Sequence, residues 1–236
     1  MKKDTILVIG ACGQIGTELT AALRLQHGSE NIIAADKIKA HPDCIELDVL
    51  DTEKLKNVVK EFGVTQIYLL AAMLSATGEK NIDAAWKLNM QSLLSVLEIA
   101  REQQLDKVFW PSSIAIFGPG APRHNCPQDT IIEPTTVYGI SKRTGEYWCN
   151  YYFNNFGVDV RSLRYPGLIS YTTPPGGGSE AIVRASRAGS PARRTAAPGR
   201  RATGCPGAGA RRRARGSRRN RTRRPRATCR PRRRSR

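Results

Sequence analysis

Three glycines spaced three residues apart, Gly10, Gly13 and Gly16, follow an apolar run near the start of the chain. The run Thr5–Ile9 is typical of a buried parallel strand, and residues 14–26 carry apolar side chains at helical spacing. Glycines between a strand and a helix allow a tight turn, let the backbone approach a pyrophosphate, and let the helix pack on the strand. Free N–H groups at the start of the helix bind phosphate oxygens. The spacing therefore predicts a dinucleotide site, in which Gln14 and Ile15 also contact the cofactor.

Asp36 closes the next predicted strand, Asn31–Ala35, and lies 20 residues beyond Gly16. A carboxylate at this place accepts hydrogen bonds from both hydroxyls of the adenosine ribose and repels a 2′-phosphate, which favours NAD over NADP. Capping of the strand end is the alternative role for Asp36. Asp48, with Val49 beside it, follows a third predicted strand and is expected either to contact adenine or to cap its loop.

The other apolar runs alternate between strand and helix along the first 165 residues. The predicted strands are 5–9, 31–35, 45–47, 66–72, 107–110 and 159–164, and the predicted helices are 14–26, 51–62, 81–104 and 135–156. Alternation of this kind implies right-handed βαβ crossovers and a Rossmann-type doubly wound parallel sheet of the α/β class. Ligands of such a sheet bind at the carboxyl ends of its strands.

This rule places the end of the fourth predicted strand, Leu70, Ala71 and Ala72, beside the cofactor. Ser75 and Thr77 follow at the same crevice, where contact with a substrate and a plain loop role both stay open. Asn89 is a polar residue in an otherwise apolar stretch of the helix 81–104. It is expected either to bind backbone near the cofactor site or to face solvent.

Tyr138 and Lys142 lie four residues apart near the start of the long helix 135–156, so both side chains share one helical face. A lysine and a positive nicotinamide nearby favour the phenolate and lower the pKa of the tyrosine. Such a tyrosine removes the proton of a hydroxyl group while a hydride leaves for the nicotinamide. Ser113, at the end of the fifth predicted strand, is expected to orient the substrate oxygen.

The net charge of +18 is not spread over the chain. Residues 181–236 contain 21 Arg, no Lys and no acidic residue, whereas the first 180 residues hold the other 17 basic residues and all 20 acidic ones, a net charge of −3. Beyond Val183 there is no aromatic or large aliphatic side chain, so this tail buries too little apolar surface to fold. Two parts are therefore predicted: a Rossmann domain at 1–178 and a disordered arginine-rich tail at 179–236.

The six cysteines lack CxxC spacing and a cysteine–histidine cluster, which favours free thiols in a reducing compartment over metal or disulfide use. No apolar run approaches the length of a membrane span. Because the chain enters a strand almost at once, no signal peptide is expected. A cytoplasmic protein without a metal is predicted.

Taken together, these motifs resemble the extended short-chain dehydrogenase/reductase superfamily, which includes nucleotide-sugar epimerases and dehydratases. Within it they resemble the short-chain-type L-threonine 3-dehydrogenases. The resemblance covers about residues 4–178 and is carried by the segments Leu70–Ala76, Ala85–Met90, Phe109–Gly118, Val137–Lys142, Arg161–Tyr171 and Gly176–Gly178.

The resemblance implies NAD-dependent oxidation of the 3-hydroxyl of L-threonine to 2-amino-3-ketobutyrate. Tyr138 would be the base, Lys142 its partner and Ser113 the ligand of the substrate hydroxyl. Ser75 would line the amino-acid pocket, and the segment from Tyr165 to Leu168 would pass beside the nicotinamide. The resemblance also implies a homodimer formed through the two long helices, 81–104 and 135–156.

After Gly178 the family continues with a Thr/Asp-containing segment and a small substrate-binding domain, whereas this chain continues with Ser179, Glu180 and the arginine-rich tail. The favoured hypothesis is a reading-frame shift in GC-rich DNA, whose out-of-frame codons encode mainly Arg, Ala, Gly and Pro. A natural extension and a basic arm for nucleic acid are the alternatives. Impaired dehydrogenase activity is therefore expected. Two alternative functions stay open: a nucleotide-sugar epimerase or dehydratase, and a non-catalytic NAD-binding protein whose tail binds nucleic acid non-specifically.

Overall fold

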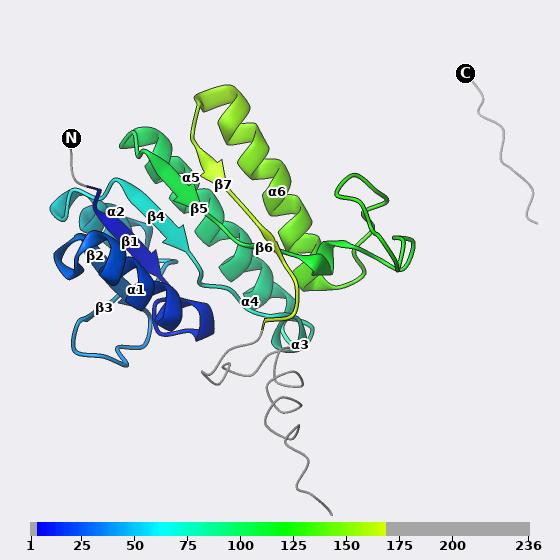
Figure 1. The fold of residues 1–236 in the computed structure, drawn as a ribbon, viewed down its shortest axis with the longest axis horizontal. Helices are drawn as coiled ribbons and strands as arrows, with labels where there is room; N and C mark the ends of the chain where they lie inside the picture. Colours follow the sequence, from blue (N-terminus) through cyan, green and yellow to red (C-terminus); the bar gives the residue numbers. More distant parts are fainter. Residues whose placement is uncertain (1–3, 169–236) are drawn as a thin grey trace, which may run out of the picture. The chain divides into compact units, whose positions relative to one another are not determined.

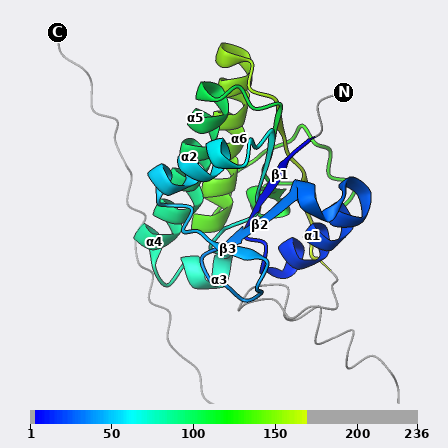
Figure 2. The same cartoon turned by 90° about the vertical axis from the view of Figure 1, so that its left-hand side faces the viewer.

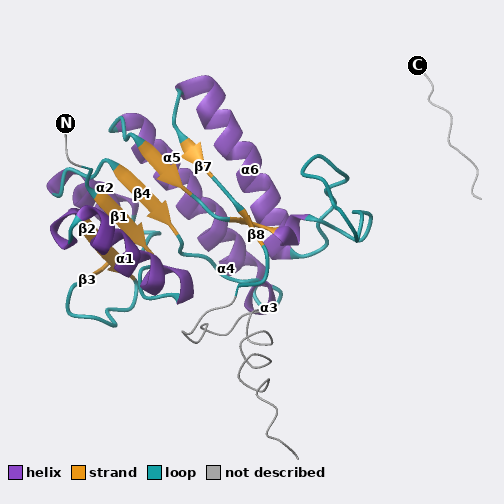
Figure 3. Cartoon of the chain, viewed as in Figure 1, coloured by secondary structure: helices purple, strands orange, loops and turns teal. Residues whose placement is uncertain are grey.

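The computed structural model describes residues 4–168, which are built around a six-stranded parallel sheet (Figure 1, Figure 3). The order of its strands is β3-β2-β1-β4-β5-β7, and a separate pair, β6 and β8, is also parallel. The strands are β1 (Ile6–Ile9), β2 (Ile32–Asp36), β3 (Cys44–Glu46), β4 (Gln66–Leu69), β5 (Lys107–Phe109), β6 (Ser112–Ser113), β7 (Val160–Arg161) and β8 (Arg164–Tyr165). The predicted Rossmann-type sheet is confirmed.

Helices cover both faces of this sheet. Figure 2 shows α1 (Gln14–His27) on one side and α2 (Thr52–Glu61), α5 (Ser92–Glu102) and α6 (Val137–Phe156) on the other. Along β1, Leu7 and Ile9 pack in the core under α2 and α5, while Ile6 and Val8 pack in the core under α1. Each such fully buried aliphatic side chain contributes roughly 1.5–3 kcal/mol, so both faces stabilise the sheet.

The fourth strand is shorter than the predicted 66–72. Its ladder with β1 ends at the pair Ile9 and Leu69, with a last bond from the Leu70 N–H to the Ile9 carbonyl at 2.8 Å. Gly10 then turns away with φ of 88°, so residues 70–72 have no strand to pair with. They continue as irregular backbone along the carboxyl edge of the sheet.

The last predicted strand, 159–164, is divided between two sheets. β7 pairs with β5, whereas β8 pairs with β6. The change of sheet coincides with Pro111, which follows β5 and has no N–H to donate to a ladder. The short β6–β8 pair was not predicted because two-residue strands leave no periodic pattern.

The long helix predicted at 81–104 consists of three pieces. α4 (Ile82–Trp86) is capped by the Asn81 side chain, which accepts from the Ala84 N–H at 3.1 Å. A π turn, η2 (Lys87–Gln91), joins α4 to α5. The remaining short elements are η1 (Ser29–Asn31), α3 (Ser75–Gly78) and η3 (Ile114–Ile116). α3 turns the predicted crevice loop around Ser75 and Thr77 into one helical turn.

The arginine-rich tail lies outside the described residues. Within residues 4–168, no helix is long and apolar enough to cross a membrane. The same residues contain no group of three His, Cys, Asp or Glu side chains that could hold a metal ion.

Candidate active site

A cleft of about 930 Å³ opens at the carboxyl ends of the strands. It brings together nearly every residue that the sequence singled out for binding or chemistry. The predicted residues that line it are Gly10, Gly13, Gln14, Ile15, Gly16, Asp36, Asp48, Val49, Leu70, Ala71, Ala72, Ser75, Thr77, Ser113, Tyr138, Lys142, Tyr165 and Leu168. Asn89 is the predicted residue that is not part of its wall.

The glycine turn is shaped so that a side chain has no room at two of its positions. A Cβ on Gly10 would lie 2.7 Å from the backbone nitrogen of Ala71, and a Cβ on Gly16 would lie 2.1 Å from the Gly10 carbonyl oxygen. α1 begins directly after Gly13, without a side-chain cap, and its first residues line the cleft. The unpaired N–H groups of a first helical turn bind anions, so this cradle fits a dinucleotide pyrophosphate.

Asp36 performs the capping role that was considered for it, and it also lines the cleft, where binding of the ribose stays a prediction. Its Oδ2 accepts from the Cys12 N–H at 3.0 Å and its Oδ1 accepts from the Ile38 N–H at 3.2 Å. These bonds cap the end of β2 and also fix the carboxylate at the cleft wall. A carboxylate has about four acceptor positions, so the remaining ones can receive ribose hydroxyls.

Asp48 likewise caps its loop while lining the cleft. It accepts from the Leu50 N–H at 3.0 Å and forms an ion pair with Lys37, whose Nζ lies 2.8 Å from Oδ2. The hydrogen bond from Lys37 holds the pKa of the Asp48 carboxyl below its ordinary value. Asp48 therefore stays ionised beside the predicted adenine position.

The start of α6 is fixed by two caps. Thr136 Oγ1 accepts from the Gly139 N–H at 3.0 Å, and Glu79 Oε1 accepts from the Val137 N–H at 2.7 Å. Tyr138 and Lys142 then lie on the face of the helix that lines the cleft, as their spacing predicts. Good caps contribute roughly 1 kcal/mol each, which holds this first turn in place.

Lys142 is a buried side chain that lies next to the start of β6. Its Nζ donates to the Pro111 carbonyl oxygen at 2.6 Å and lies 4.3 Å from the centre of the Trp110 ring. The distance from Nζ to the centre of the Tyr138 ring is 5.5 Å. The backbone of the residue before β6 thus orients the lysine toward the tyrosine.

In the cofactor-free chain the pKa of Tyr138 lies above its ordinary value, while the predicted lowering depends on a bound nicotinamide and stays a prediction. Burial raises the pKa of Tyr138, and its hydrogen bond with Ser113 opposes that shift only in part. Burial also lowers the pKa of Lys142 to about 7, which weakens the positive charge on which the prediction depended. Desolvation, which the sequence pattern did not reveal, is the largest cause of both shifts.

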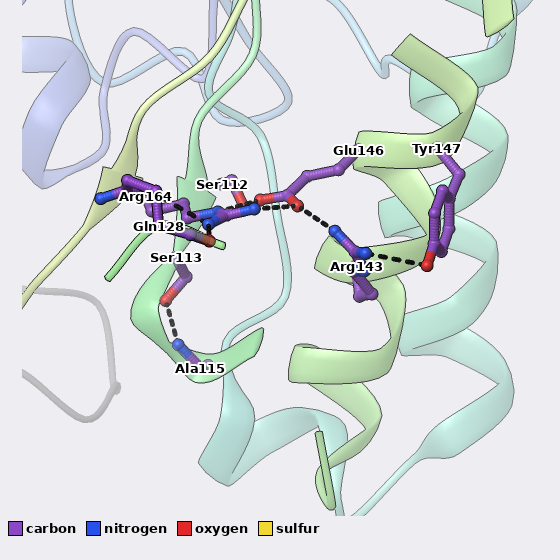
Figure 4. Close-up of polar contacts among 8 residues, drawn as sticks. All are labelled: Ser112, Ser113, Ala115, Gln128, Arg143, Glu146, Tyr147 and Arg164. Atoms are coloured by element: carbon purple, nitrogen blue, oxygen red, sulfur yellow. Dashed lines mark hydrogen bonds and ion pairs between the residues drawn. The ribbon is translucent and has the colours of Figure 1, made fainter. Parts of the chain in front are cut away.

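A network of charged side chains joins α6 to β6 and β8 (Figure 4). Glu146, one turn after Lys142, accepts from Ser112 Oγ at 2.7 Å and from Arg143 Nη1 at 3.0 Å. Arg164 binds both oxygens of Glu146, at 2.9 and 3.0 Å. Burial pushes the pKa of Glu146 upward, but the bonds from Arg164, Ser112 and Arg143 hold it below its ordinary value. The network positions Ser113, the neighbour of Ser112, opposite the helix that carries Tyr138.

Asn89 does not line the cleft but binds the backbone of Met73, which does. It is buried in the π turn, where its Oδ1 accepts from the Met73 N–H at 2.8 Å and its Nδ2 donates to the Met73 carbonyl at 3.0 Å. Its amide also lies 3.3 Å from Ser141 Oγ on α6. The backbone role that was considered for Asn89 is confirmed and the solvent-facing alternative is wrong, while a direct contact with the cofactor is not supported by its position.

Several residues of the cleft were not foreseen. Ser112 lines the cleft, while Glu146 and Arg164 support it without being part of its wall. The contacts among these three join residues at least 18 positions apart, and only the position of Glu146, four after Lys142, offered a signal. The other unforeseen wall residues are Ile9, Cys12, Lys37, Ile38, Ala40, Leu47, Met73, Leu74, Leu88, Pro111, Ile114 and Ala115. Most of them are neighbours of predicted residues on the same turn or strand end.

Comparison with known proteins agrees with this geometry. The chain is 49% identical over 185 residues to an uncharacterized epimerase/dehydratase of Staphylococcus epidermidis, covering 75% of this chain and 57% of the relative. The solved holo form of a GalE-like L-threonine dehydrogenase from Cupriavidus necator is 54% identical with a TM-score of 0.75, covering 78% of this chain and 61% of that one. A partial-consensus L-threonine 3-dehydrogenase is 56% identical with the same TM-score and the same shares of the two chains.

The chain therefore spans about 57% of the length of its curated relatives. The model of the NAD-dependent epimerase/dehydratase family matches residues 6–192, which include the glycine turn, Asp36 and the Tyr138–Lys142 pair. The family description confirms NAD as the predicted cofactor. The chain belongs to the NAD-dependent epimerase/dehydratase family.

Proposed function

We propose that this chain derives from an enzyme that oxidises the 3-hydroxyl of L-threonine with NAD, giving 2-amino-3-ketobutyrate. The observation that carries the proposal is the meeting of Tyr138, Lys142 and Ser113 in one cleft with the glycine turn. The 54–56% identity to L-threonine dehydrogenases supports the choice of substrate.

The three side chains have distinct roles in this proposal. Ser113 holds the substrate hydroxyl, and the phenol oxygen of Tyr138, once deprotonated, accepts the hydroxyl proton. Bound NAD⁺ supplies the acceptor for the hydride that leaves the same carbon. Lys142, held by the Pro111 carbonyl, favours the phenolate when it is protonated and otherwise donates its hydrogen bonds to the cofactor ribose. Ser75 and Thr77 lie where the amino-acid part of the substrate would be bound.

The activity of the chain as it stands is expected to be low. Its similarity to complete relatives covers about three-fifths of their length, and the arginine-rich tail takes the place of the segment that closes the site in the proposed family. Positioning of the substrate and exclusion of water supply a large part of enzymatic rates, and both depend on such closure.

The test is to replace residues 179–236 by the corresponding carboxyl-terminal segment of the Cupriavidus necator enzyme and to measure NADH formation with L-threonine. The grafted chain is expected to be active and the original chain nearly inactive, while Tyr138→Phe in the graft abolishes activity with NAD binding intact. Near-normal turnover by the original chain refutes the role given to the missing segment. An inactive graft that folds and binds NAD refutes the threonine proposal.

An epimerase or dehydratase acting on a nucleotide sugar is the second candidate, since the curated relatives at 46–49% identity carry that description. The two candidate functions differ in whether NADH accumulates during the reaction. An epimerase returns the hydride and accumulates no NADH, so incubation of the graft with a uridine-diphosphate sugar would interconvert sugars without absorbance from NADH. A chain that binds NAD and converts neither substrate would be a non-catalytic NAD-binding protein, the third candidate.

We also propose that a complete enzyme of this kind is a cytoplasmic homodimer formed through α5 and α6. α6 exposes the aromatic side chains of Tyr147, Trp148 and Tyr151, and a hollow of about 440 Å³ between α2, α5 and α6 is lined by Leu94 and Trp148 among others. A second copy would bury these apolar surfaces. Sedimentation of the graft measures its mass, and a monomer that persists at high concentration contradicts the dimer.

The tail is proposed to be the product of a frameshift and to bind nucleic acid only non-specifically. Sequencing the gene across codons 176–184 and translating the other two frames tests the first point. Recovery of a Thr/Asp-containing segment followed by an ordinary mixed-charge domain supports it, and its absence from both frames contradicts it. Steeply salt-dependent DNA binding that is lost on deleting 181–236 would assign that binding to the tail.

A further inference from the structure

Two cysteines that are distant in the sequence meet at the wall of the dinucleotide cleft. Cys12 lies in the glycine turn and lines the cleft, and Cys44 is the first residue of β3 and is buried. Their sulfur atoms are 3.6 Å apart. Thiols from two different elements are therefore in contact beside the cleft that the glycine turn and Asp36 line.

The other cysteines of the described region have no such partner. Cys126 is exposed and Cys149 is buried on α6, where burial raises the pKa of its thiol to about 12. Cys12, by contrast, is partly exposed at the cleft, so a small oxidant that enters the cleft can reach it. The pair therefore combines one accessible sulfur with one protected sulfur in contact with it.

We propose that Cys12 and Cys44 form a reversible disulfide under peroxide and that this modification weakens NAD binding. In the first step the Cys12 thiolate attacks one peroxide oxygen, the O–O bond breaks, and a sulfenic acid and water are formed. In the second step the Cys44 sulfur attacks the sulfenic sulfur, the S–O bond breaks, and a second water leaves. The two thiols lose two electrons and two protons, and one hydrogen peroxide is reduced to two waters.

The environment of Cys44 sets the rate of the second step. Burial and the contact with Cys12 raise the pKa of Cys44 to about 12, so little of its thiolate is present near neutral pH. Closure of the disulfide is therefore slow at pH 7 and accelerates as the pH rises. Dithiothreitol reverses the cross-link by thiol–disulfide exchange.

The cross-link weakens cofactor binding because both sulfurs are attached to parts of the cradle. A disulfide bond is about 2.05 Å long, so the sulfurs must approach by about 1.5 Å. The backbone of Cys12 donates to the Asp36 carboxylate and precedes Gly13, where α1 begins. Displacing Cys12 disturbs both Asp36, the predicted ligand of the ribose, and the phosphate-binding turn. Because the two effects are linked, bound NAD must disfavour the disulfide by the same factor by which the disulfide weakens NAD binding.

The experiment uses the full chain with Cys126, Cys205 and Cys229 replaced by Ser, so that intermolecular disulfides do not form. Hydrogen peroxide is added at pH 8, and peptide mapping under non-reducing conditions measures a Cys12–Cys44 linkage and its rate with and without NAD. Titration calorimetry then measures NAD affinity before oxidation, after it and after dithiothreitol. The expected results are a linked peptide whose formation NAD slows, and an affinity reduced about tenfold or more that dithiothreitol restores.

Matched variants separate the cross-link from other oxidation. Cys44→Ser keeps Cys12 but cannot close the disulfide, so no linked peptide is formed and peroxide alone is expected to lower its NAD affinity less than that of the parent. Cys149→Ser is expected to behave like the parent chain. Oxidation of Cys12 to sulfinic acid without a linked peptide overturns the proposal, and so does a linked chain that binds NAD as tightly as the reduced one. Circular dichroism before and after oxidation shows that the fold is retained, so a loss of affinity is not the result of unfolding.

Discussion

The two sides of the cleft are built by opposite means. On the side of β1, α1 and β2, the wall is mostly backbone, and the tight contacts are between main-chain atoms such as the Gly10 carbonyl and the residue Gly16. On the side of β6, α6 and β8, the wall is held by side chains, with Glu146 and Arg164 joining the three elements. Added side-chain atoms are therefore expected to disturb the first side, and loss of a hydrogen-bonding partner is expected to disturb the second.

This difference follows from what each side is proposed to bind. A pyrophosphate is bound by N–H groups that every residue possesses, so the chain has only to approach closely, which glycine permits. Proton transfer needs a phenol, an amine and a hydroxyl at fixed separations, and these side chains need others to orient them. We therefore expect a side chain added on the first side and a side chain removed from the second to have effects of different kinds.

The largest effect is expected from Gly16→Ala. The new Cβ would lie 2.1 Å from the Gly10 carbonyl oxygen, so the turn must open. We expect a loss of about 3 kcal/mol of unfolding free energy and of about 100-fold in NAD affinity. Urea denaturation and calorimetry measure the two. Gly120→Ala is the matched control, because its Cβ meets only ordinary contacts at 3.5 Å, and equal effects of the two changes would contradict the argument.

The second effect is expected from Glu146→Ala, which removes the partner of Arg164, Arg143 and Ser112. The carboxylate is largely buried, so its loss leaves unpaired donors and costs about 2–3 kcal/mol of unfolding free energy. Glu98→Ala is the control, because its ion pair with Arg101 is exposed and contributes little, and its other side-chain partner, Tyr152, is only partly buried. Denaturation of both variants tests the difference, and a similar loss in each would show that the buried network adds nothing.

The third effect depends on pH and concerns Lys142. Its pKa is lowered from 10.5 to about 7 in the folded chain, so between these values the unfolded chain binds more protons. Stability therefore increases as the pH rises from about 7 toward 10, and the burial penalty is greatest below pH 7. Lys142→Met is expected to flatten this slope and to be more stable than the parent by about 2 kcal/mol at pH 6. Thermal denaturation across this range checks it, and parallel curves for the two chains would contradict the buried charge.

The smallest effect is expected from Asp36→Asn, which keeps the size of the side chain and one of its two acceptor contacts but removes the charge. NAD affinity should decrease by about tenfold or less, while NADP affinity rises because the repulsion of a 2′-phosphate is lost. Calorimetry with both cofactors measures the ratio. An unchanged ratio would mean that Asp36 serves only to cap β2 through Cys12 and Ile38.

The backbone side of the cleft was the more predictable one. The glycine spacing, Asp36 and the strand ends follow each other within a short stretch, so local pattern and the rule about carboxyl ends located them. Tyr138 and Lys142 could be predicted equally well, because two residues that are four positions apart on a helix share a face. The six strands and their parallel arrangement followed from the alternation of apolar runs.

The supporting contacts could not be predicted in the same way. Glu146 meets Arg164 and Ser112 only because β6 and β8 leave the main sheet after Pro111, and no periodicity marks two-residue strands. The pKa of Tyr138 depends on burial, which a sequence pattern does not measure. The meeting of Cys12 with Cys44 required the register of β2 and β3, with Ala34 beside Cys44.

The order of strands also determines how this sheet can assemble during synthesis. Of the strands that the structure describes in this sheet, β1 is made first, and it lies in the interior of the order β3-β2-β1-β4-β5-β7. Among the described strands of this sheet, each later one joins an edge that already exists: β2 and β3 extend one side, and β4, β5 and β7 extend the other. No strand of this set has to be inserted between two that are already paired, so the sheet can grow outward while translation continues. The glycine turn and Asp36, between β1 and the end of β2, are thus made before Ser113, Tyr138 and Lys142, which are proposed to carry the chemistry.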